Sequence, residues 1–567
     1  MEKLLKYESN AFFTKELDVD ELFTVEDFSD EHQMMADMTD SFVEQDLMPV
    51  LPDMEKQNFD QVIRMIKKSG ELGLLGVDIP EQYGGMELDK VSAIIITEHI
   101  AKGRSFNVTY SGQIGIGSLP IVYYGTEEQK KKYLPSIASG EKIGAYALTE
   151  PDAGTDAIGI KTTAQLSEDG THYVINGEKQ FITNAAFADF FILYAKVDGD
   201  QFTAFIVDQD TEGITIGPEE QKMGLKGSST TSIVLSDVKV PVENVLGEIG
   251  RGHSIAFNIL NIGRHKISAT CIGTAKRALE LAVQHTTERK QFKRALSEFN
   301  LTKEKLASMA VNVFAMESMV YRTAGEFEKG AQFAEENGIP FLKLLKNYAA
   351  ECSVNKVFAS EALDDIVDES LQLHGGYGFV QEYEIETLYR DSRINRIFEG
   401  TNEINRIVTA NSILENVDFY LQKRTVKGGC SEQLTKQWEL LQSLRTFTGQ
   451  FAKVVHETHS NAHEEQELLV RLADFTTLTY ALESSLLRVE KMLKNSTVKN
   501  VDHNVRLVKV FAEEAAVTFL TKALSIPYED SELTDQLTEL MTQVQETRIH
   551  SIDEKRQIAN VVISRGS

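Results

Sequence analysis

The hydrophobic pattern of the chain changes twice along its length, and these two changes limit the possible fold. Up to about residue 140, apolar side chains recur at three- and four-residue spacing, which indicates helices. Between residues 143 and 246 the pattern becomes short β-branched and aromatic runs separated by turns, which indicates strands. Helical spacing returns from residue 253 onward. The clearest predicted helices are 27–54, 59–75, 90–102, 253–289, 301–329, 340–372 and 404–421, and the clearest predicted strands are 173–177, 190–197, 202–207 and 231–240.

A glycine pair marks one more boundary near the C-terminal end. Lys427-Gly428-Gly429 is typical of a linker, and residues 431–567 beyond it again carry helical spacing. We therefore predict an α+β multidomain protein. Its predicted parts are an N-terminal helical domain (1–142), a middle β-barrel or β-sandwich domain (143–248), a helical bundle (249–424) and an extra C-terminal helical domain (425–567).

The net charge and the cysteine content limit the kinds of binding partner and the cellular compartment that suit this protein. The 567 residues carry a net charge of −28, which disfavours nucleic acid and favours a basic protein as a docking partner. Cys271, Cys352 and Cys430 are far apart, form no zinc-ligand set or disulfide framework, and fit a reducing compartment. The N-terminus lacks an apolar signal segment, and no apolar run reaches the ~20 residues of a membrane span. We expect a soluble cytoplasmic protein, and the sequence gives membrane association no support.

Familiar nucleotide and metal motifs are missing or weak. Residues 154–162 superficially resemble a phosphate loop, but no lysine directly follows the second glycine. No G-x-G-x-x-G fingerprint links a strand to a helix, which argues against a Rossmann domain. His456, His459 and His463 share one predicted helix face and could bind a metal. Because no carboxylate accompanies them, we favour a solvent-exposed polar stretch and predict no metal site.

The segment 108–124 is unusually small and apolar, with Gly112, Gly115 and Gly117 followed by Pro120. Glycine destabilises a helix interior by roughly 1 kcal/mol relative to alanine. We infer that another part of the protein or a ligand approaches this backbone closely. The alternative is a loosely helical buried segment.

A break at Glu399 interrupts the predicted helices of the bundle. The apolar run Ile394–Phe398 ends there, and Gly400-Thr401-Asn402 supplies turn formers with Thr401 or Asn402 as a cap for the next helix. A carboxylate at such a junction, backed by apolar residues, suits a general base. The pattern alone leaves open an ordinary solvated glutamate on a surface loop.

Four motifs in this order carry a resemblance to a known family. They are the loop Tyr146–Asp156, the strand end Phe181–Asn184, the glycine-rich run Gln372–Phe379 and the turn Phe398–Asn402. Together, over residues 30 to about 420, the chain resembles the acyl-CoA dehydrogenases. The extra C-terminal helical domain makes it most similar to the very-long-chain enzymes and their bacterial long-chain counterparts.

The resemblance implies a reaction and a base. In this family a carboxylate removes the α-proton of a fatty acyl thioester while a hydride passes from the β-carbon to FAD. By resemblance, Glu399 is that base. A second family position for the base, on a bundle helix, is occupied here by Gly263, which has no carboxylate.

The resemblance also assigns the binding residues. The usual Trp of the flavin site is Phe181 here, the usual Gly after Phe292 is Lys293, and Asn300 replaces a common Gln. The implied FAD contacts are Tyr146, Leu148, Thr149, Gly154, Thr155, Phe181, Thr183, Arg289, Phe292, Gln372, Gly375, Gly376, Thr401 and Glu403, with Arg289 reaching a neighbouring subunit's FAD. The implied acyl-CoA contacts are Thr155, Asn261, Arg264 and Gly400.

The finer function follows from the same resemblance. Val108 and Gly112 occupy positions where medium-chain enzymes carry polar residues that close the acyl pocket, so a deeper tunnel for long chains is expected. We expect β-oxidation of acyl-CoA to trans-2-enoyl-CoA, electron transfer to an electron-transfer flavoprotein, and a homodimer. The alternatives are an acyl-CoA oxidase that uses O₂ and a non-catalytic assembly protein with a vestigial dehydrogenase core.

Overall fold

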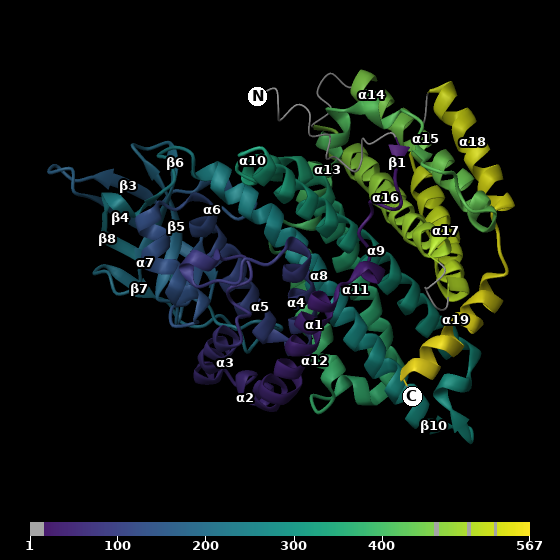
Figure 1. Cartoon of the computed structure of the whole chain (residues 1–567), viewed down its shortest axis with the longest axis horizontal. Coiled ribbons are helices and arrows are strands. Elements are labelled where there is room, and N and C mark those ends of the chain that lie inside the picture. The colour runs from purple at the N-terminus through teal and green to yellow at the C-terminus, as the bar shows by residue number, and fades with distance from the viewer. Residues whose placement is uncertain (1–15, 459–463, 496–500, 527–529, 567) are drawn as a thin grey trace. The chain divides into compact units, whose positions relative to one another are not determined.

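The computed structural model describes residues 16–458, 464–495, 501–526 and 530–566, which form two compact units (Figure 1). Unit 1 comprises Met1–Ser29 and Thr274–Ser567, and unit 2 comprises Asp30–Gly273. The helix α8 (Gly252–Glu288) contributes residues to both. Helices before and after a single large sheet confirm the predicted α+β class. The division into four domains stays a prediction.

The helices of unit 2 follow the predicted periods, with one interruption. The expected helix 27–54 is broken because Pro49 and Pro52 lack the amide hydrogens that a continuous helix needs. A π-helical turn at Val43–Leu47 and a 3₁₀ turn at Met48–Val50 fill the break. The helices are α1 (Asp30–Phe42), α2 (Leu51–Met54), α3 (Phe59–Glu71), α4 (Lys90–Ile100), α5 (Ser105–Gly112), α6 (Leu119–Tyr124) and α7 (Glu127–Ala138).

The glycine-rich segment forms a π-helical turn, Gln113–Gly117, between α5 and α6. Gly117 lies so close to the sheet that a Cβ there would be 3.1 Å from the carbonyl oxygen of Gly144. The Gln113 side chain fixes this approach, because its Nε2 donates to the Lys142 carbonyl (2.8 Å) and its Oε1 accepts from the Gly144 amide (2.8 Å). The predicted close approach to this backbone is confirmed at Gly117.

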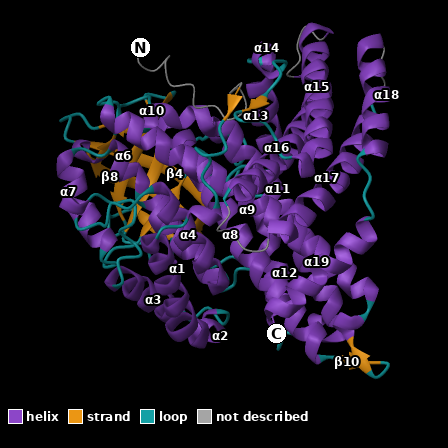
Figure 2. Ribbon diagram, turned by 45° about the vertical axis from the view of Figure 1, so that its right-hand side comes forward, coloured by secondary structure: helices purple, strands orange, loops and turns teal. Residues whose placement is uncertain are grey.

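The β part of unit 2 is one eight-stranded mixed sheet, drawn in orange in Figure 2. Its strand order is β7-β8-β4-β3-β5-β6-β9, and β2 pairs with β5 in parallel. The continuous apolar run of β5 is buried, as expected for a central strand, whereas β4 alternates. The strands are β2 (Gly144–Ala147), β3 (Thr163–Leu166), β4 (His172–Thr183), β5 (Phe190–Val197), β6 (Gln201–Asp208), β7 (Ile214–Ile216), β8 (Thr230–Pro241) and β9 (Val245–Leu246).

Unit 1 contains the long bundle helices and the C-terminal helices. In Figure 1, α15, α16 and α17 lie side by side, and the close helix-to-helix contacts agree. The helices after α8 are α9 (Asn300–Glu336), α10 (Leu342–Leu345), α11 (Ala349–His374), α12 (Glu384–Ser392), α13 (Asn402–Leu414), α14 (Val417–Tyr420), α15 (Thr435–Thr458), α16 (Gln466–Lys494), α17 (Val501–Ala523), α18 (Ser531–Glu546) and α19 (Ser551–Gly566).

The C-terminal helices share a hydrophobic core with the bundle. Phe314 of α9 and Ile413 of α13 belong to the same buried cluster as Leu482 of α16 and Phe511 of α17. The apolar faces of these C-terminal helices are therefore buried against the bundle. Among the described helices, none combines the length and apolar character required to cross a bilayer.

Two short strand pairs complete unit 1. β1 (Glu16–Leu17) pairs in parallel with β12 (Thr425–Val426), so the predicted linker begins beside the N-terminal segment. β10 (Lys290–Gln291) and β11 (Arg294–Ala295) form a hairpin.

Candidate active site

Glu399 occupies a strained turn between two helical segments of unit 1. Its backbone has φ of +54°, a left-handed conformation that non-glycine residues rarely adopt, and Gly400 follows at +85°. A 3₁₀ turn, Arg393–Arg396, precedes it, and α13 follows. The Thr401 hydroxyl caps α13 by accepting from the Ile404 amide at 3.3 Å. The predicted junction and its threonine cap are confirmed.

Buried side chains hold the backbone of this turn from behind. The Nζ of Lys356, a fully buried residue of α11, donates to the Gly400 carbonyl (2.9 Å) and to Asn402 Oδ1 (2.8 Å). The side-chain amide of Asn405 also donates, through Nδ2, to the Gly400 carbonyl at 2.8 Å. The Glu399 side chain itself is half-buried. The carboxylate is therefore presented on a turn whose backbone is fixed by the bundle.

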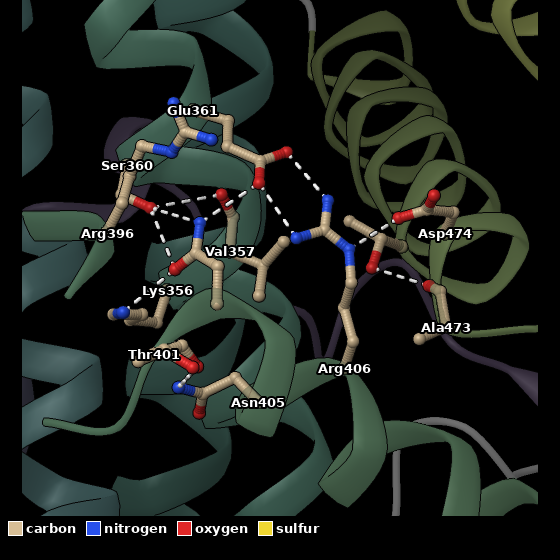
Figure 3. A network of polar contacts seen from close by, with 12 residues as sticks. Lys356, Val357, Ser360, Glu361, Arg396, Thr401, Asn405, Arg406, Ala473 and Asp474 are labelled. Carbon is tan, nitrogen blue, oxygen red and sulfur yellow. Dashed lines mark hydrogen bonds and ion pairs between the residues drawn. The ribbon is translucent and has the colours of Figure 1, made fainter. Parts of the chain in front are cut away.

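The arginines around Glu399 pair with other carboxylates. Arg390 bonds Glu386 one turn earlier (2.7 Å), and Arg396 bonds Asp364 of α11 (2.9 Å). Arg406 lies between Glu361 of α11 and Asp474 of α16 (Figure 3). The Arg390 pair lies within α12, whereas the pairs of Arg396 and Arg406 connect separate helical segments, which supports a scaffold role for the arginines.

A second group of predicted residues lies on the loop after β2 and at the C-terminal end of β4, in unit 2. These two segments are called the sheet edge below. The loop after β2 is tied to the end of β4, because the Gln180 amide donates to the Thr149 carbonyl at 2.9 Å. Thr155 and Phe181 are exposed, and Thr149 and Thr183 are half-buried. Tyr146 and Leu148, in contrast, are buried in the sheet core. The accessible residues of this edge are thus the hydroxyls, Gly154 and the Phe181 ring.

Sequence reasoning missed the ion pair that organises this loop. Glu150 and Lys179 are both buried, with Oε1 and Nζ 2.6 Å apart. Lys179 also donates to the Leu148 carbonyl (3.2 Å), and Glu150 accepts from the Thr162 amide and hydroxyl. Burial lowers the pKa of Lys179 to about 8, although Glu150 opposes that shift. Glu150 lies within the recognised loop, but nothing in the sequence connects it to Lys179.

The predicted acyl-CoA contacts Asn261 and Arg264 lie one turn apart on α8, within unit 2. Both are buried, and the Arg264 guanidinium donates to the Asn261 side-chain oxygen at 2.8 Å. Gly263 between them is helical and carries no carboxylate.

The remaining predicted flavin residues lie at helix ends of unit 1. α11 ends at His374, two residues after Gln372, and Gly375 follows in a left-handed conformation with φ of +59°. Arg289, just beyond α8, stacks on the ring of Tyr377, with 5.4 Å between guanidinium carbon and ring centroid. The structure therefore brings Arg289 together with the Gly375-Gly376 turn. Thr401 and Glu403 are found at the start of α13.

Phe292 projects from the β10–β11 hairpin and is 88% exposed. Phe292 and Lys293 form the two-residue turn, with φ of +50° and +69°. Such a turn requires positive φ at both positions, which explains why glycine suits the position of Lys293. The lysine adopts the conformation nonetheless.

Comparisons with known proteins agree with this architecture. Models of acyl-CoA dehydrogenase domains match residues 29–141 (N-terminal domain), 145–238 (middle domain) and 250–414 (C-terminal domain), and another C-terminal domain model matches 452–545. A probable acyl-CoA dehydrogenase of Bacillus subtilis (strain 168) is 49% identical over 524 residues, covering 89% of this chain and 88% of the relative. The chain belongs to the acyl-CoA dehydrogenase family.

Two further similarities extend this result. The very long-chain specific acyl-CoA dehydrogenase of Rattus norvegicus is 34% identical over 489 residues, covering 79% of this chain and 72% of the rat protein. A crystal structure of an acyl-CoA dehydrogenase complexed with FAD from Bacillus anthracis matches with a TM-score of 0.92 and 46% identity, covering 98% of each chain. The predicted similarity to very-long-chain and bacterial enzymes is confirmed, and this acyl-CoA dehydrogenase is an FAD-dependent oxidoreductase.

The sheet edge of this acyl-CoA dehydrogenase fits the FAD requirement. Within the described residues, no side-chain hydrogen bond engages the hydroxyls of Thr149, Thr155 or Thr183. A Cβ added at Gly154 would meet no atom within 4 Å. Available donors beside an open backbone suit a ligand rich in acceptors.

Metal chemistry finds no support in the part of the enzyme that the structure describes. No group of three or more potential ligands is close enough there to hold an ion. Of the three histidines considered from sequence, His456 is exposed, whereas His459 and His463 lie outside the described residues.

Proposed function

We propose that this acyl-CoA dehydrogenase converts long-chain acyl-CoA to trans-2-enoyl-CoA in fatty-acid β-oxidation, with Glu399 as the base. The observation that carries the proposal is the turn at Glu399, whose backbone is held by Lys356 and Asn405. Gly263 leaves the other family position for a base without a carboxylate. Glu399 is therefore the candidate that both the family pattern and the local geometry support.

The chemistry requires one proton acceptor and one hydride acceptor. The Glu399 carboxylate takes the proton from the α-carbon of the thioester, and a new carbon–carbon double bond forms as a hydride leaves the β-carbon. FAD, when bound, supplies the acceptor for that hydride. Holding the carboxylate in a fixed geometry replaces a random encounter, an effect that can contribute about 7 kcal/mol or more to catalysis.

The binding residues carry over as part of the same proposal. Thr149, Gly154, Thr155, Phe181 and Thr183 would hold the flavin from the edge of the sheet. Tyr146 and Leu148 would support that edge from the sheet core. Arg289, Phe292, Gln372, Gly375, Gly376, Thr401 and Glu403 complete the proposed FAD contacts, and Thr155, Asn261, Arg264 and Gly400 are the proposed acyl-CoA contacts.

Open space beside the glycine-rich turn supports long acyl chains. Gly115 is buried, yet a Cβ added there would meet no atom within 4 Å. At Gly112 an added Cβ would lie 3.2 Å from the Asn184 side chain. The absent side chain at Gly115 leaves interior room that an extended hydrocarbon would fill, whereas Asn184 already occupies the space beside Gly112.

The electron acceptor and the oligomer are proposed from the family and the surface. A net charge of −28 is compatible with a docked flavoprotein acceptor that presents basic residues. The exposed Phe292 ring in the turn of the β10–β11 hairpin suits a contact with a second copy of the chain, in a homodimer. Two buried free cysteines and one exposed free cysteine agree with a cytoplasmic location.

Anaerobic titration of the yellow protein with acyl-CoA of four to eighteen carbons tests the reaction and its chain length. We expect the flavin to bleach fastest with the long chains. Glu399→Gln should bind the substrate and bleach at least about a hundredfold more slowly, since it removes the base. Bleaching of Glu399→Gln at the wild-type rate would refute the assignment.

The rival functions give different results in the same preparation. Stoichiometric hydrogen peroxide in air, without a need for a flavoprotein acceptor, would identify an oxidase. Colourless protein that fails to bind added FAD would indicate a non-catalytic assembly protein. Light scattering that finds a tetramer would contradict the homodimer.

A further inference from the structure

A continuous chain of buried and half-buried polar contacts runs from the C-terminal helices to the turn that carries Glu399, and Figure 3 shows it from Asp474 onward. It begins at Lys522 of α17, whose Nζ bonds Asp474 Oδ2 of α16 at 2.7 Å. The other Asp474 oxygen, Oδ1, accepts from Arg406 Nε of α13 at 2.7 Å. The chain thus crosses three helices before it reaches the neighbourhood of the base.

Arg406 transmits this contact to α11. Both of its terminal nitrogens bond the Glu361 carboxylate, each at 2.8 Å, in the bidentate geometry that fixes a guanidinium most firmly. Because its Nε is bonded to Asp474, every nitrogen of the Arg406 guanidinium has a carboxylate partner. The side chains of Arg406 and Asp474 are only 13% and 6% exposed, so water cannot substitute easily for either partner.

Glu361 connects the arginine to the turn. Its Oε1 also accepts from the side-chain Nδ2 of Asn402 at 3.0 Å. Asn402 Oδ1 accepts from Lys356 Nζ, and the same lysine donates to the Gly400 carbonyl, adjacent to Glu399. A shift of Arg406 would therefore reach the Gly400 carbonyl through three side chains, those of Glu361, Asn402 and Lys356.

The turn needs support of this kind. A left-handed conformation at a non-glycine residue such as Glu399 is unfavourable and persists only where its surroundings fix it. Asp474 lies in the region 452–545, which a separate C-terminal domain model matches, outside the three models that cover the catalytic core. The support for the turn thus includes a carboxylate from the additional part of the chain.

We propose that Asp474 is a positioning residue for Glu399: through Arg406, Glu361 and Asn402 it fixes the turn from which the base acts. The proposal rests on the proposed role of Glu399. It assigns the C-terminal helices a part in the chemical step, in addition to the burial of apolar surface. The competing explanation is that the Asp474–Arg406 pair only fastens α13 to α16.

The two explanations differ in the rate per bound flavin. The test compares anaerobic bleaching of the FAD-loaded wild type, Asp474→Asn and Glu490→Gln by saturating hexadecanoyl-CoA in a stopped-flow instrument. Glu490 is a matched control because it is a buried carboxylate on the same helix, and it bonds the Ser431 amide and the Trp438 indole. Melting temperature, FAD content and the Kd of hexadecanoyl-CoA are measured in parallel.

We expect Asp474→Asn to bleach about tenfold to a hundredfold more slowly per bound flavin, the range that follows a misplacement of about 1 Å. Its Kd should stay within about twofold of wild type. Glu490→Gln should lower the melting temperature but keep the wild-type rate per flavin. If Asp474 served stability alone, Asp474→Asn would contain less bound FAD, but the FAD that is bound would bleach at the wild-type rate. This result would overturn the proposal.

A second variant keeps the test decisive if Asp474→Asn fails to fold. Arg406→Lys retains the positive charge but cannot bond Glu361 and Asp474 together as a planar guanidinium does. It should show the same loss of limiting rate at nearly constant Kd, and a wild-type rate would reject the proposal. A wrong assignment of the base gives a different result from a wrong positioning role. If Glu399 were not the base, Glu399→Gln would also bleach at the wild-type rate.

Discussion

Replacement of Lys179 by methionine tests how the loop of the sheet edge is held. The lysine is fully buried and its Nζ lies 2.6 Å from Glu150 Oε1, so Lys179→Met leaves a buried carboxylate without its counter-charge. Loss of one partner from a buried ion pair costs about 3–5 kcal/mol. Glu150 keeps its bonds from the Lys161 amide and from Thr162, which places the expected cost near the lower end, about 3 kcal/mol.

Thermal melting followed by flavin fluorescence measures this loss. A cost of about 3 kcal/mol corresponds to a decrease of roughly 6–12 °C in the melting temperature for a unit of this size. We also expect weaker FAD retention, because the pair ties the Leu148 carbonyl and the loop after β2 to β4. The double variant Glu150→Gln with Lys179→Met should recover much of the loss, since no buried charge remains.

Lys161→Met is the matched control for that variant. Lys161 belongs to the same loop, but its pair with Asp152 is exposed, so we expect no measurable change in melting temperature. The pH dependence of the free energy of unfolding supplies an independent check. The pKa of Lys179 is about 8 in the folded protein against 10.5 in the unfolded chain, so the unfolded state binds more protons between these values. The contribution of Lys179 to stability should therefore increase from pH 8 to about 10.5, and Lys179→Met should lose this increase. Lys179→Met that melts like the wild type and retains FAD equally well would refute the reasoning.

Three further predictions concern other parts of the enzyme. Burial and the nearby Lys266 charge lower the pKa of His265 to about 3, so stability is lost as pH falls below the unfolded value of 6.5. Chemical denaturation at pH 7 and pH 5 should show a loss of about 2 kcal/mol from this group, which His265→Asn removes; an unchanged pH slope in the variant would contradict it. Gly115→Met should fill the open space beside the π-helical turn and lower the ratio of hexadecanoyl-CoA to octanoyl-CoA bleaching rates by about tenfold, and an unaltered ratio would exclude this turn from the acyl site. Phe292→Ser should weaken self-association in light scattering, whereas a dimer of unchanged concentration dependence would place the interface elsewhere.

The elements that the sequence predicted well are those set by local pattern. The apolar run of β5 and the turn formers after Glu399 both lie where the periods and caps placed them. The expected helix 27–54 failed at Pro49 and Pro52, where two missing amide hydrogens outweighed a persistent apolar stripe.

The contacts that the sequence could not predict join residues far apart in the chain. Lys356 is 44 residues from Gly400, and Asp474 is 68 residues from Arg406. Ion pairs of this kind have no period, and a buried lysine is indistinguishable by composition from an exposed one. Similarly, the apolar stripes of α16 and α17 predicted burial but not that the partner surface would be the bundle.

The pairing of β1 with β12 has a consequence for synthesis of the protein. Unit 2 is one uninterrupted segment, Asp30–Gly273, so all of its residues are available once that stretch has left the ribosome. Unit 1 is discontinuous, because its N-terminal residues pair with residues that are synthesised much later. Residues 16–17 pair with 425–426, and Glu26 bonds the guanidinium of Arg488 in α16 at 2.7 Å. We expect the N-terminal segment to remain protease-sensitive on nascent chains that already contain a folded sheet. Residues 16–29 should become protected only after β12 and α16 have been synthesised.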